Sequence, residues 1–524
     1  MHWADLLAQK LIQRDNNHVI ATSTSISGRI HLGNAGDAIF ADSAYKALKR
    51  LGPKSVKLVW FSEDIDPFRR VPMGLPPSFE RYIGMPASSL PCPEGCCHSF
   101  VEHYSKMFLR SLKKLGIEPE VHSTTDMYLK GVFEDCVKKA IEKRGEIRKI
   151  FKNISGAERP EDWIPFDPIC ENCGRISTTK PLSYKDGMVE YKCEGGMVRG
   201  NWVNGCGHKS FSDLRHGKLP WRVEWAARWS IFKITCEPFG KEHAVSGGSY
   251  DTSKVISKVI YGWEPPIPLQ YEHILVAGKK MSKSLGNIIT LEELLKILEP
   301  EVIRFFFFRV KTTTHKDFEI EKGIIPLIKE YERVERLYYG AEHPSKGEDP
   351  DELKRIYELS QVEKLQKNFV QIPYAHLATL FQISDDESII TQALEKSDHM
   401  RGTEEEIEEL HRMLPLVKNF LTTSAADGLR FTIKREFGKE EIQMVGEREK
   451  ECFGRIAERM DGIKDEDELT NFIYSLSKEM GIKPKDTFRM IYRLFLGQNN
   501  GPKAGSLLLS LDKDFVKKRL RLME

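Results

Sequence analysis

The first third of the chain alternates short apolar runs with segments of helical periodicity. Residues 18–25 are β-branched and small, residues 34–50 repeat apolar side chains at helical spacing, and residues 55–61 return to a strand pattern. A strand, a glycine-containing turn, a helix and a strand in this order predict a βαβ unit. We therefore expect a parallel sheet whose ligand crevice lies at the carboxyl ends of its strands.

The pattern changes twice further along the chain. From about residue 165 to 217, cysteines, glycines and short strand-like pieces dominate, which indicates an insertion with its own scaffold. Helical periodicity at 250–260 and a strand pattern at 269–276 complete the α/β part, and beyond about residue 315 amphipathic helices prevail, for instance at 324–338, 404–420 and 484–496. We expect an α/β domain over residues 1–320, interrupted by the 165–217 insertion, and an all-α domain over 321–524.

Composition narrows the class of protein without identifying it. A chain of 524 residues is long enough for two or three domains, each with a core of its own. A mean hydropathy of −0.41 argues against a bundle of membrane spans, and no secretory signal is visible, so we expect a cytoplasmic protein without a membrane partner. With 79 basic and 77 acidic residues, the net charge alone does not indicate nucleic-acid binding.

His31-Leu32-Gly33-Asn34 stands where the first predicted strand passes into a helix. At such a place backbone N–H groups and the helix dipole favour phosphate, and Gly33 allows a close approach of the backbone. An imidazole and a carboxamide can donate hydrogen bonds to oxygens whose charge grows during a reaction. Taken alone, the tetrapeptide is better explained as an ordinary helix start with a histidine and a turn glycine.

Lys280-Met281-Ser282-Lys283-Ser284 follows a predicted strand and is itself followed by a glycine-containing exit. Two lysines on a short loop offer compact positive charges for a triphosphate, although an exposed basic loop would look the same. The sequence contains no GxxxxGK[ST] run, which argues against a P-loop ATPase. It contains no GxSxG run either, which argues against an α/β-hydrolase nucleophile.

Together and in this order, the two motifs resemble the HIGH and KMSKS signatures of class I aminoacyl-tRNA synthetases. The resemblance implies a Rossmann-like catalytic domain in which an amino-acid carboxylate attacks the α-phosphorus of ATP, giving an aminoacyl-adenylate and pyrophosphate. Magnesium would arrive with ATP. The implied catalytic residues are His31, Asn34, Lys280 and Lys283. The implied ATP contacts are His31, Gly33, Asn34, Lys280, Ser282 and Lys283.

Segments between and after these motifs resemble the class I lysyl-tRNA synthetases of archaeal type. They include residues 217–225, 237–243, 247–252 and 299–304. The resemblance implies L-lysine and tRNA(Lys) as partners, an anticodon-binding role for the helical domain, and no role for DNA. The implied lysine-binding residues are Ser23, Ser25, Trp221, His243 and Tyr271. The acidic partner of the lysine ammonium stays open among Asp64, Asp66 and Asp251.

Ten cysteines in a chain without a secretory signal favour metal ligation over disulfides. Cys170, Cys173, Cys193 and Cys206 have the spacing of a structural zinc ribbon, with His208 as an alternative to a cysteine in the second half. A second group, Cys92, Cys96, Cys97 and His98 with His103 nearby, is an open candidate for another metal.

Three alternative functions remain open at this point. A class I synthetase for another amino acid, such as glutamate or cysteine, would share both motifs. A small-molecule nucleotidylyltransferase would share a strand-end histidine motif and a later basic loop, but such enzymes rarely carry a long helical domain after the loop. A non-catalytic tRNA-binding relative would have little reason to retain His31, Asn34, Lys280 and Lys283.

Overall fold

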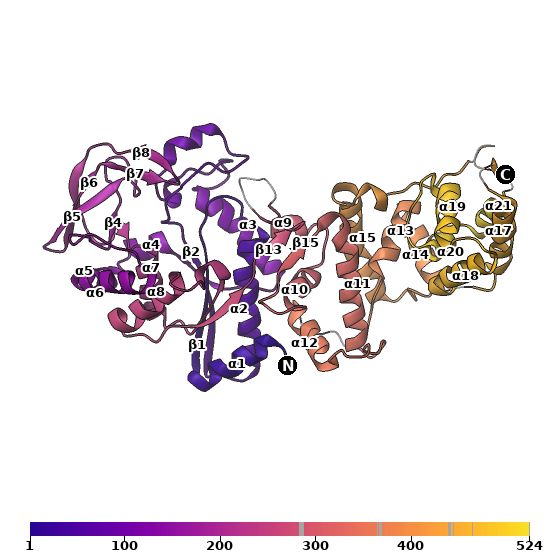
Figure 1. Ribbon diagram of the computed structural model, residues 1–524, viewed down its shortest axis with the longest axis horizontal. Coiled ribbons are helices and arrows are strands. Elements are labelled where there is room, and N and C mark those ends of the chain that lie inside the picture. Colours follow the sequence, from indigo (N-terminus) through magenta and orange to yellow (C-terminus); the bar gives the residue numbers. More distant parts are fainter. Residues whose placement is uncertain are drawn as a thin grey trace. The chain divides into compact units, whose positions relative to one another are not determined.

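The computed structural model (Figure 1) describes residues 1–281, 288–363, 365, 369–436, 438, 442–443, 445–463 and 465–522. These residues form two compact units. The first, here called the α/β unit, comprises Met1–Leu295, Ile303–Phe318 and Gly347–Leu365, and the second, the helical unit, comprises Lys296–Val302, Glu319–Lys346 and Gln366–Glu524.

The α/β unit is built on a five-stranded sheet. Its strands are β1 (Asn17–Thr24), β2 (Ser55–Ser62), β3 (Glu120–Ser123), β11 (Cys236–Gly240) and β12 (Ile267–Tyr271), in the order β12-β11-β1-β2-β3, and all neighbours are parallel. The chain builds outward from β1 in one direction and then returns to its other side. The predicted doubly wound, Rossmann-like parallel sheet is thus confirmed, with its topological switch point between β1 and β11.

Both faces of this sheet are covered, as the nearly continuous apolar runs of β1 and β2 require. On one face α2 (Leu32–Arg50) and α3 (Phe100–Lys114) pack; Trp60 of β2 lies 5.8 Å from Phe108 between ring centroids. On the other face α5 (Glu134–Glu142), α7 (Trp221–Phe232) and α8 (Ser249–Ile256) share a core with Val59 and Phe61.

Two predicted elements are divided in the structure. The helical periodicity of residues 131–149 predicts one helix, but the structure has α5 followed by α6 (Arg144–Ile150), since Lys143 leaves the helical conformation with φ −96° and ψ 18°. The strand expected at 269–276 is β12 followed by β13 (Ile274–Val276), which leaves the main sheet and pairs with β14 (Lys279–Lys280) and β15 (Lys316–Phe318). This small sheet carries Lys280 toward the switch point.

An insertion leaves and rejoins the α/β unit at one place, because β4 (Asp167–Pro168) pairs antiparallel with β10 (Gly217–Lys218). Within it β5 (Thr179–Lys185), β6 (Met188–Cys193) and β9 (Lys209–Ser212) form an antiparallel sheet, and β7 (Gly195–Val198) and β8 (Asn201–Asn204) form a hairpin. The other α-helices that the structure describes in the α/β unit are α1 (Trp3–Arg14), α4 (Thr124–Leu129), α9 (Leu291–Leu294) and α12 (Pro350–Ser360).

The helical unit contains no strand among its described residues. Its helices bury apolar faces against one another. One core cluster includes Phe453, Ile473 and Leu494. The helices are α11 (Ile320–Tyr338), α13 (Tyr374–Ile383), α14 (Glu387–Lys396), α15 (Glu404–Thr423), α17 (Glu447–Arg459), α18 (Glu466–Glu479), α19 (Pro484–Leu496), α20 (Ala504–Ser510) and α21 (Lys513–Leu520), while α10 (Pro300–Phe308) belongs partly to each unit.

Among the residues that the structure describes, none of the helices combines the length and the apolar composition that crossing a membrane requires.

Candidate active site

A cavity of about 500 Å³ opens at the switch point of the sheet. Its walls come from the carboxyl ends of β1, β11 and β12, the start of α2, the loop after β2, and the base of the insertion. This is the place where the sequence predicts a ligand crevice, and five described residues of the two predicted motifs line it: His31, Gly33, Asn34, Lys280 and Met281.

His31 is the N-cap of α2. Its Nδ1 accepts a hydrogen bond from the backbone N–H of Asn34 at 3.3 Å, so the neutral imidazole carries its proton on Nε2. Gly33 leaves room beside it, because a Cβ there would lie 3.0 Å from the His31 ring and 3.3 Å from the Met281 Cε, closer than side chains ordinarily pack. The cap therefore presents an N–H donor at the positive end of a helix.

The residues just beyond the second motif, Ile289 and Thr290, contact the first motif. The backbone N–H of Leu32 donates to the carbonyl oxygen of Ile289 at 2.7 Å, and His31 forms a β-bridge with Thr290. Lys280, on β14, lies 3.3 Å from His273 between Nζ and Nε2. Ser282 and Lys283 lie outside the described residues, so their predicted ATP contacts stay predictions.

All five residues predicted to bind lysine line the cavity: Ser23, Ser25, Trp221, His243 and Tyr271. The indoles of Trp221 and Trp225 stack at 5.1 Å between centroids, with 18° between their planes. The Tyr271 hydroxyl donates to Asp37 at 2.5 Å, and burial raises the pKa of that carboxyl well above its usual range. The two tryptophans offer flat apolar surface on which an aliphatic side chain can lie.

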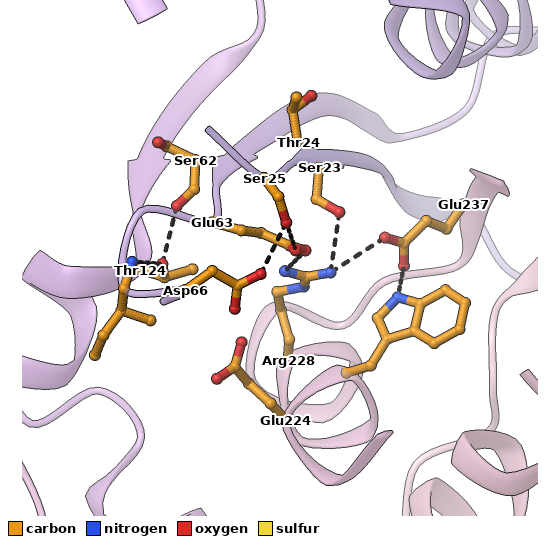
Figure 2. Close-up of polar contacts among 12 residues, drawn as sticks. Ser23, Thr24, Ser25, Ser62, Glu63, Asp66, Thr124, Glu224, Arg228 and Glu237 are labelled. Carbon is orange, nitrogen blue, oxygen red and sulfur yellow. Dashed lines mark hydrogen bonds and ion pairs between the residues drawn. The ribbon is translucent and has the colours of Figure 1, made fainter. Parts of the chain in front are cut away.

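A buried ion network that sequence reasoning missed forms the floor below Ser23 (Figure 2). Arg228, fully buried on α7, donates to Glu63 at 3.1 Å, to Glu237 at 3.4 Å and to the Ser23 hydroxyl at 3.4 Å. The indole N–H of Trp229 also donates to Glu237, at 2.6 Å. Its sequence signal is a pair of charged residues, Glu224 and Arg228, four positions apart in the tryptophan-rich segment 221–232.

The network continues through Ser25, whose hydroxyl lies within hydrogen-bond distance of Glu63, at 3.2 Å, and of Asp66, at 2.8 Å. Lys218 is 2.5 Å from Asp66 and 3.4 Å from Glu224. Four carboxyl groups, Glu63, Asp66, Glu224 and Glu237, thus share two cations, Lys218 and Arg228. Because carboxyl groups outnumber cations, the wall is suited to a ligand that brings positive charge.

Of the three acids considered from the sequence, only Asp66 lines the cavity. Asp64 accepts hydrogen bonds from Thr124 and Thr125 at the start of α4, and Asp251 accepts from the backbone N–H of Gly247. Asp167, on β4, also lines the cavity, and burial raises the pKa of its carboxyl to about 6. Asp66 and Asp167 therefore join the other carboxyl groups that line the cavity, which are Asp37, Glu63, Glu237 and Glu242.

Four cysteines of the insertion converge as the spacing predicts. Cys170 and Cys206 have sulfurs 3.6 Å apart, and Cys173 and Cys193 have sulfurs 3.7 Å apart. Sulfurs bound at 2.3 Å in a tetrahedron around zinc would lie about 3.8 Å apart, so the site fits that ion. His208 instead places its Nε2 2.8 Å from Glu171 and is not a member of the cluster.

A second cluster contains Cys92, Cys96, Cys97 and His103. The Cys92 sulfur lies 3.7 Å from that of Cys96 and 3.3 Å from that of Cys97, and the Nδ1 of His103 is 3.2 Å from the Cys96 sulfur. His98, which is adjacent in sequence, is replaced here by His103. The latter lies one turn inside α3 and is buried.

Comparisons with known proteins agree with the resemblance that the two motifs suggest. A family model described as tRNA synthetases class I (K) matches residues 1–363. A lysine–tRNA ligase of Methanosphaera stadtmanae is 38% identical, covering 100% of this chain and 99% of that protein. Lysine–tRNA ligases of Archaeoglobus fulgidus (37% identical; 99% of each chain) and Methanocaldococcus jannaschii (36% identical; 100% of each chain) match equally completely.

Proposed function

Because this chain belongs to the class I (K) family of tRNA synthetases, we propose that it is an ATP-dependent lysine–tRNA ligase. It would activate L-lysine as lysyl-adenylate and transfer the lysyl group to the 3′-terminal adenosine of tRNA(Lys). The observation that carries lysine as the substrate is the excess of carboxyl groups over cations in the buried network beside the cavity. The reaction and its substrates correspond to a cytoplasmic protein of translation, without a DNA or membrane partner.

Adenylate formation asks the protein to hold the lysine carboxylate in line with the α-phosphorus and to neutralise charge on the departing pyrophosphate. His31 donates from Nε2 at the N-terminus of α2, Gly33 admits the phosphates to the backbone, and Asn34 adds a carboxamide. Lys280 supplies positive charge, as does Lys283 by family resemblance, and the Ser282 hydroxyl would by the same resemblance add a hydrogen-bond donor. Magnesium bound to the triphosphate would contribute further charge neutralisation.

The lysine side chain would run along Trp221 with Tyr271 and His243 around it, while Ser23 and Ser25 fix the end of β1. Ser23 is held by Arg228, and Ser25 by Glu63 and Asp66. Asp66 and Asp167 are the carboxyl groups on this wall that would face the ammonium.

Amino-acid-dependent exchange of pyrophosphate into ATP, with tRNA present and a panel of amino acids, tests the proposal. We expect lysine to support exchange, and glutamate and cysteine to give at most background. Exchange with another amino acid would identify a different class I synthetase. Adenylyl transfer to a small cofactor without any amino acid would identify a nucleotidylyltransferase.

Lysine recognition is expected to weaken in acid. Burial raises the pKa of Asp167 to about 6, so this carboxyl loses its charge as pH falls through that value. A cationic substrate then loses an attractive charge, and the KM for lysine should rise between pH 7 and pH 5 by roughly tenfold, the effect of about one charge contact. Steady-state kinetics should show that Asp167→Asn raises KM at pH 7 and flattens this rise. An unchanged pH profile in Asp167→Asn would remove Asp167 from the site.

We propose a structural zinc ion at each cysteine cluster, one held by Cys170, Cys173, Cys193 and Cys206, the other by Cys92, Cys96, Cys97 and His103. Elemental analysis of freshly purified protein should then find two zinc ions per chain, one for each cluster. Cys193→Ser and Cys97→Ser should each remove one. Cys452→Ser, at a buried cysteine of the helical unit, is the matched control and should remove none. Full zinc content in Cys193→Ser would refute the first site.

We propose residues 1–320 as the catalytic domain, with a zinc-binding insertion at 165–217, and residues 321–524 as the anticodon-binding domain. The basic cluster Lys517, Lys518 and Arg519 in α21 belongs to the second domain, although Arg519 is buried and donates to backbone carbonyl oxygens of Leu494 and Arg435. Affinity for tRNA that falls with salt concentration would support electrostatic docking. A salt-independent affinity would contradict it.

A further inference from the structure

Two histidines and a glutamate of the helical unit converge on one point. They are His376 on α13, His399 in the turn after α14, and Glu466 at the start of α18. One nitrogen of each ring and one carboxylate oxygen all lie within 4.8 Å of one another. His376 is buried at 5% exposure, whereas the side chains of Glu466 and His399 are 17% and 30% exposed. The cluster therefore lies at the edge of the core, with one side accessible to solvent.

The Oε1 atom of Glu466 lies between the two imidazole rings. It is 2.6 Å from His376 Nδ1 and 3.9 Å from His399 Nε2. This oxygen is buried, yet no donor among the described residues is aligned to give it a hydrogen bond. A buried carboxylate oxygen without a hydrogen-bond donor is costly unless a cation meets it. The neighbouring ring nitrogens can supply that cation in two ways, as a protonated imidazole or as ligands of a metal ion.

The hydrogen bonds of Ser397 indicate which nitrogen of His376 carries a proton. The Ser397 hydroxyl has a single proton, which it donates to the carbonyl oxygen of Ala393 at 2.9 Å. Toward His376 Nε2, at 3.3 Å, the Ser397 oxygen is therefore the acceptor. In a neutral His376 the lone pair is then on Nδ1, which faces Glu466 and the Ser506 hydroxyl, 2.9 Å away. A metal-bound histidine has this arrangement, because its second nitrogen donates to an outer partner.

Backbone features fix the positions of the three side chains. The N–H of His399 donates to the carbonyl oxygen of Leu394 at 3.0 Å, and between them Asp398 has φ +56°. Aspartate tolerates this left-handed conformation better than most residues, and the turn brings the two histidine rings to 4.7 Å between centroids. Gly505 lets α20 lie directly on the start of α18, because a Cβ there would overlap the carbonyl oxygen of Glu466.

We propose that His376 Nδ1, His399 Nε2 and Glu466 Oε1 bind a zinc ion in the helical unit. Two imidazoles and one carboxylate suit a divalent transition metal rather than magnesium or calcium, which take oxygen ligands. Tetrahedral zinc holds nitrogen and oxygen donors about 3.4 Å apart, so the distances of 2.6 and 3.9 Å require only small rotations of the side chains. Water completes the coordination on the exposed side.

This ion differs from those proposed at the two cysteine clusters. It joins α13, the turn after α14 and the start of α18, which are far apart in the sequence. It has no thiolate ligand, so it is held less tightly and is lost in metal-free buffer, whereas the ions at the cysteine clusters are kept. The inference goes beyond the proposed function and does not depend on it.

The test uses the full-length protein, purified in metal-free buffer with its cysteine clusters loaded, and Zn²⁺ titrated in a calorimeter. We expect uptake of one further ion per chain and a higher Tm in the presence of zinc, because a ligand of the folded state stabilises it. His399→Gln and Glu466→Gln, which keep a side chain of similar size, should each abolish both effects. His411→Gln, at an exposed histidine of α15 that lies 2.6 Å from Glu387, is the matched control and should keep both.

Cobalt(II) identifies the donor atoms at the same site. Added to the protein with loaded cysteine clusters, it should give visible d–d absorption without the sulfur-to-metal charge-transfer band that thiolate ligands produce. His399→Gln should remove this absorption, and circular dichroism should show that the variant keeps its helices.

A protein that takes up no further zinc would overturn the inference and leave the cluster as an ion pair between protonated His376 and Glu466. Unchanged uptake in His399→Gln or in Glu466→Gln would overturn it as well, since the ion would then be bound elsewhere. Neither lysine nor tRNA takes part in these measurements. Failure of the proposed function would instead appear as absent lysine-dependent exchange, whatever the zinc content of the helical unit.

Discussion

Replacing His31 with asparagine is expected to slow adenylate formation by about 10² to 10³-fold, the usual cost of removing one donor aimed at a transition-state oxygen. Asparagine is also an excellent N-cap, so the side-chain acceptor for the backbone N–H of Asn34 should remain. The substitution therefore separates the imidazole donor from the structural cap, and the helix should keep its stability.

The measurements are single-turnover formation of lysyl-adenylate and thermal unfolding. His31→Asn should lose rate with an unchanged Tm, whereas His31→Ala should lose both rate and about 1 kcal/mol of stability, because the cap is gone. A His31→Asn protein that forms adenylate at the wild-type rate would show that the ring does no chemistry and serves α2 alone.

The sheet and the nucleotide side of the site were predictable because their signals are local. Strand residues 17–24, the glycine-bearing turn and the apolar periodicity of α2 lie within one continuous stretch, and a parallel βαβ unit admits one handedness. His31 follows a predicted strand directly, so its place at the carboxyl edge follows from topology, whereas Lys280 reaches the cavity on β14 of the small second sheet. The split of residues 269–276 into β12 and β13 was not predictable, because both halves are apolar and only long-range packing decides which sheet each half joins.

The buried ion network below Ser23 could not be predicted from the sequence. Glu63, Arg228 and Glu237 come from a strand end, a helix and another strand, and each alone looks like an ordinary charged residue. Of the acids considered from the sequence, Asp64 instead accepts a hydrogen bond from the backbone N–H of Thr125 at the start of α4. In the second cysteine cluster, adjacency in sequence favours His98, but helix geometry places His103, four residues after the N-cap of α3, on the side of α3 that faces Cys92 and Cys96.

Among substitutions of the polar residues described above in the α/β unit, Arg228→Met is expected to destabilise the fold most. Arg228 is fully buried, its guanidinium lies 4.7 Å above the Phe61 ring, and it is the cation between Glu63 and Glu237. Methionine replaces the stem but leaves two buried carboxyl groups without their shared partner. Breaking a buried pair in this way costs about 3 to 5 kcal/mol.

Chemical denaturation of the variant measures this loss, and Arg215→Met provides the matched control. Arg215 pairs with Glu134 at 2.9 Å, but both side chains are partly exposed, so its loss should be below about 1 kcal/mol. The loss in free energy of unfolding caused by Arg228→Met should also become smaller as pH falls. Burial already raises the pKa of Glu237 despite Arg228, and without that cation the pKa must rise further, so the folded variant takes up a proton that the unfolded chain does not hold. Protonation then removes the unpaired charge. If the loss in free energy of unfolding caused by Arg228→Met stays constant from pH 8 to pH 5, its cause is lost packing on Phe61 rather than charge.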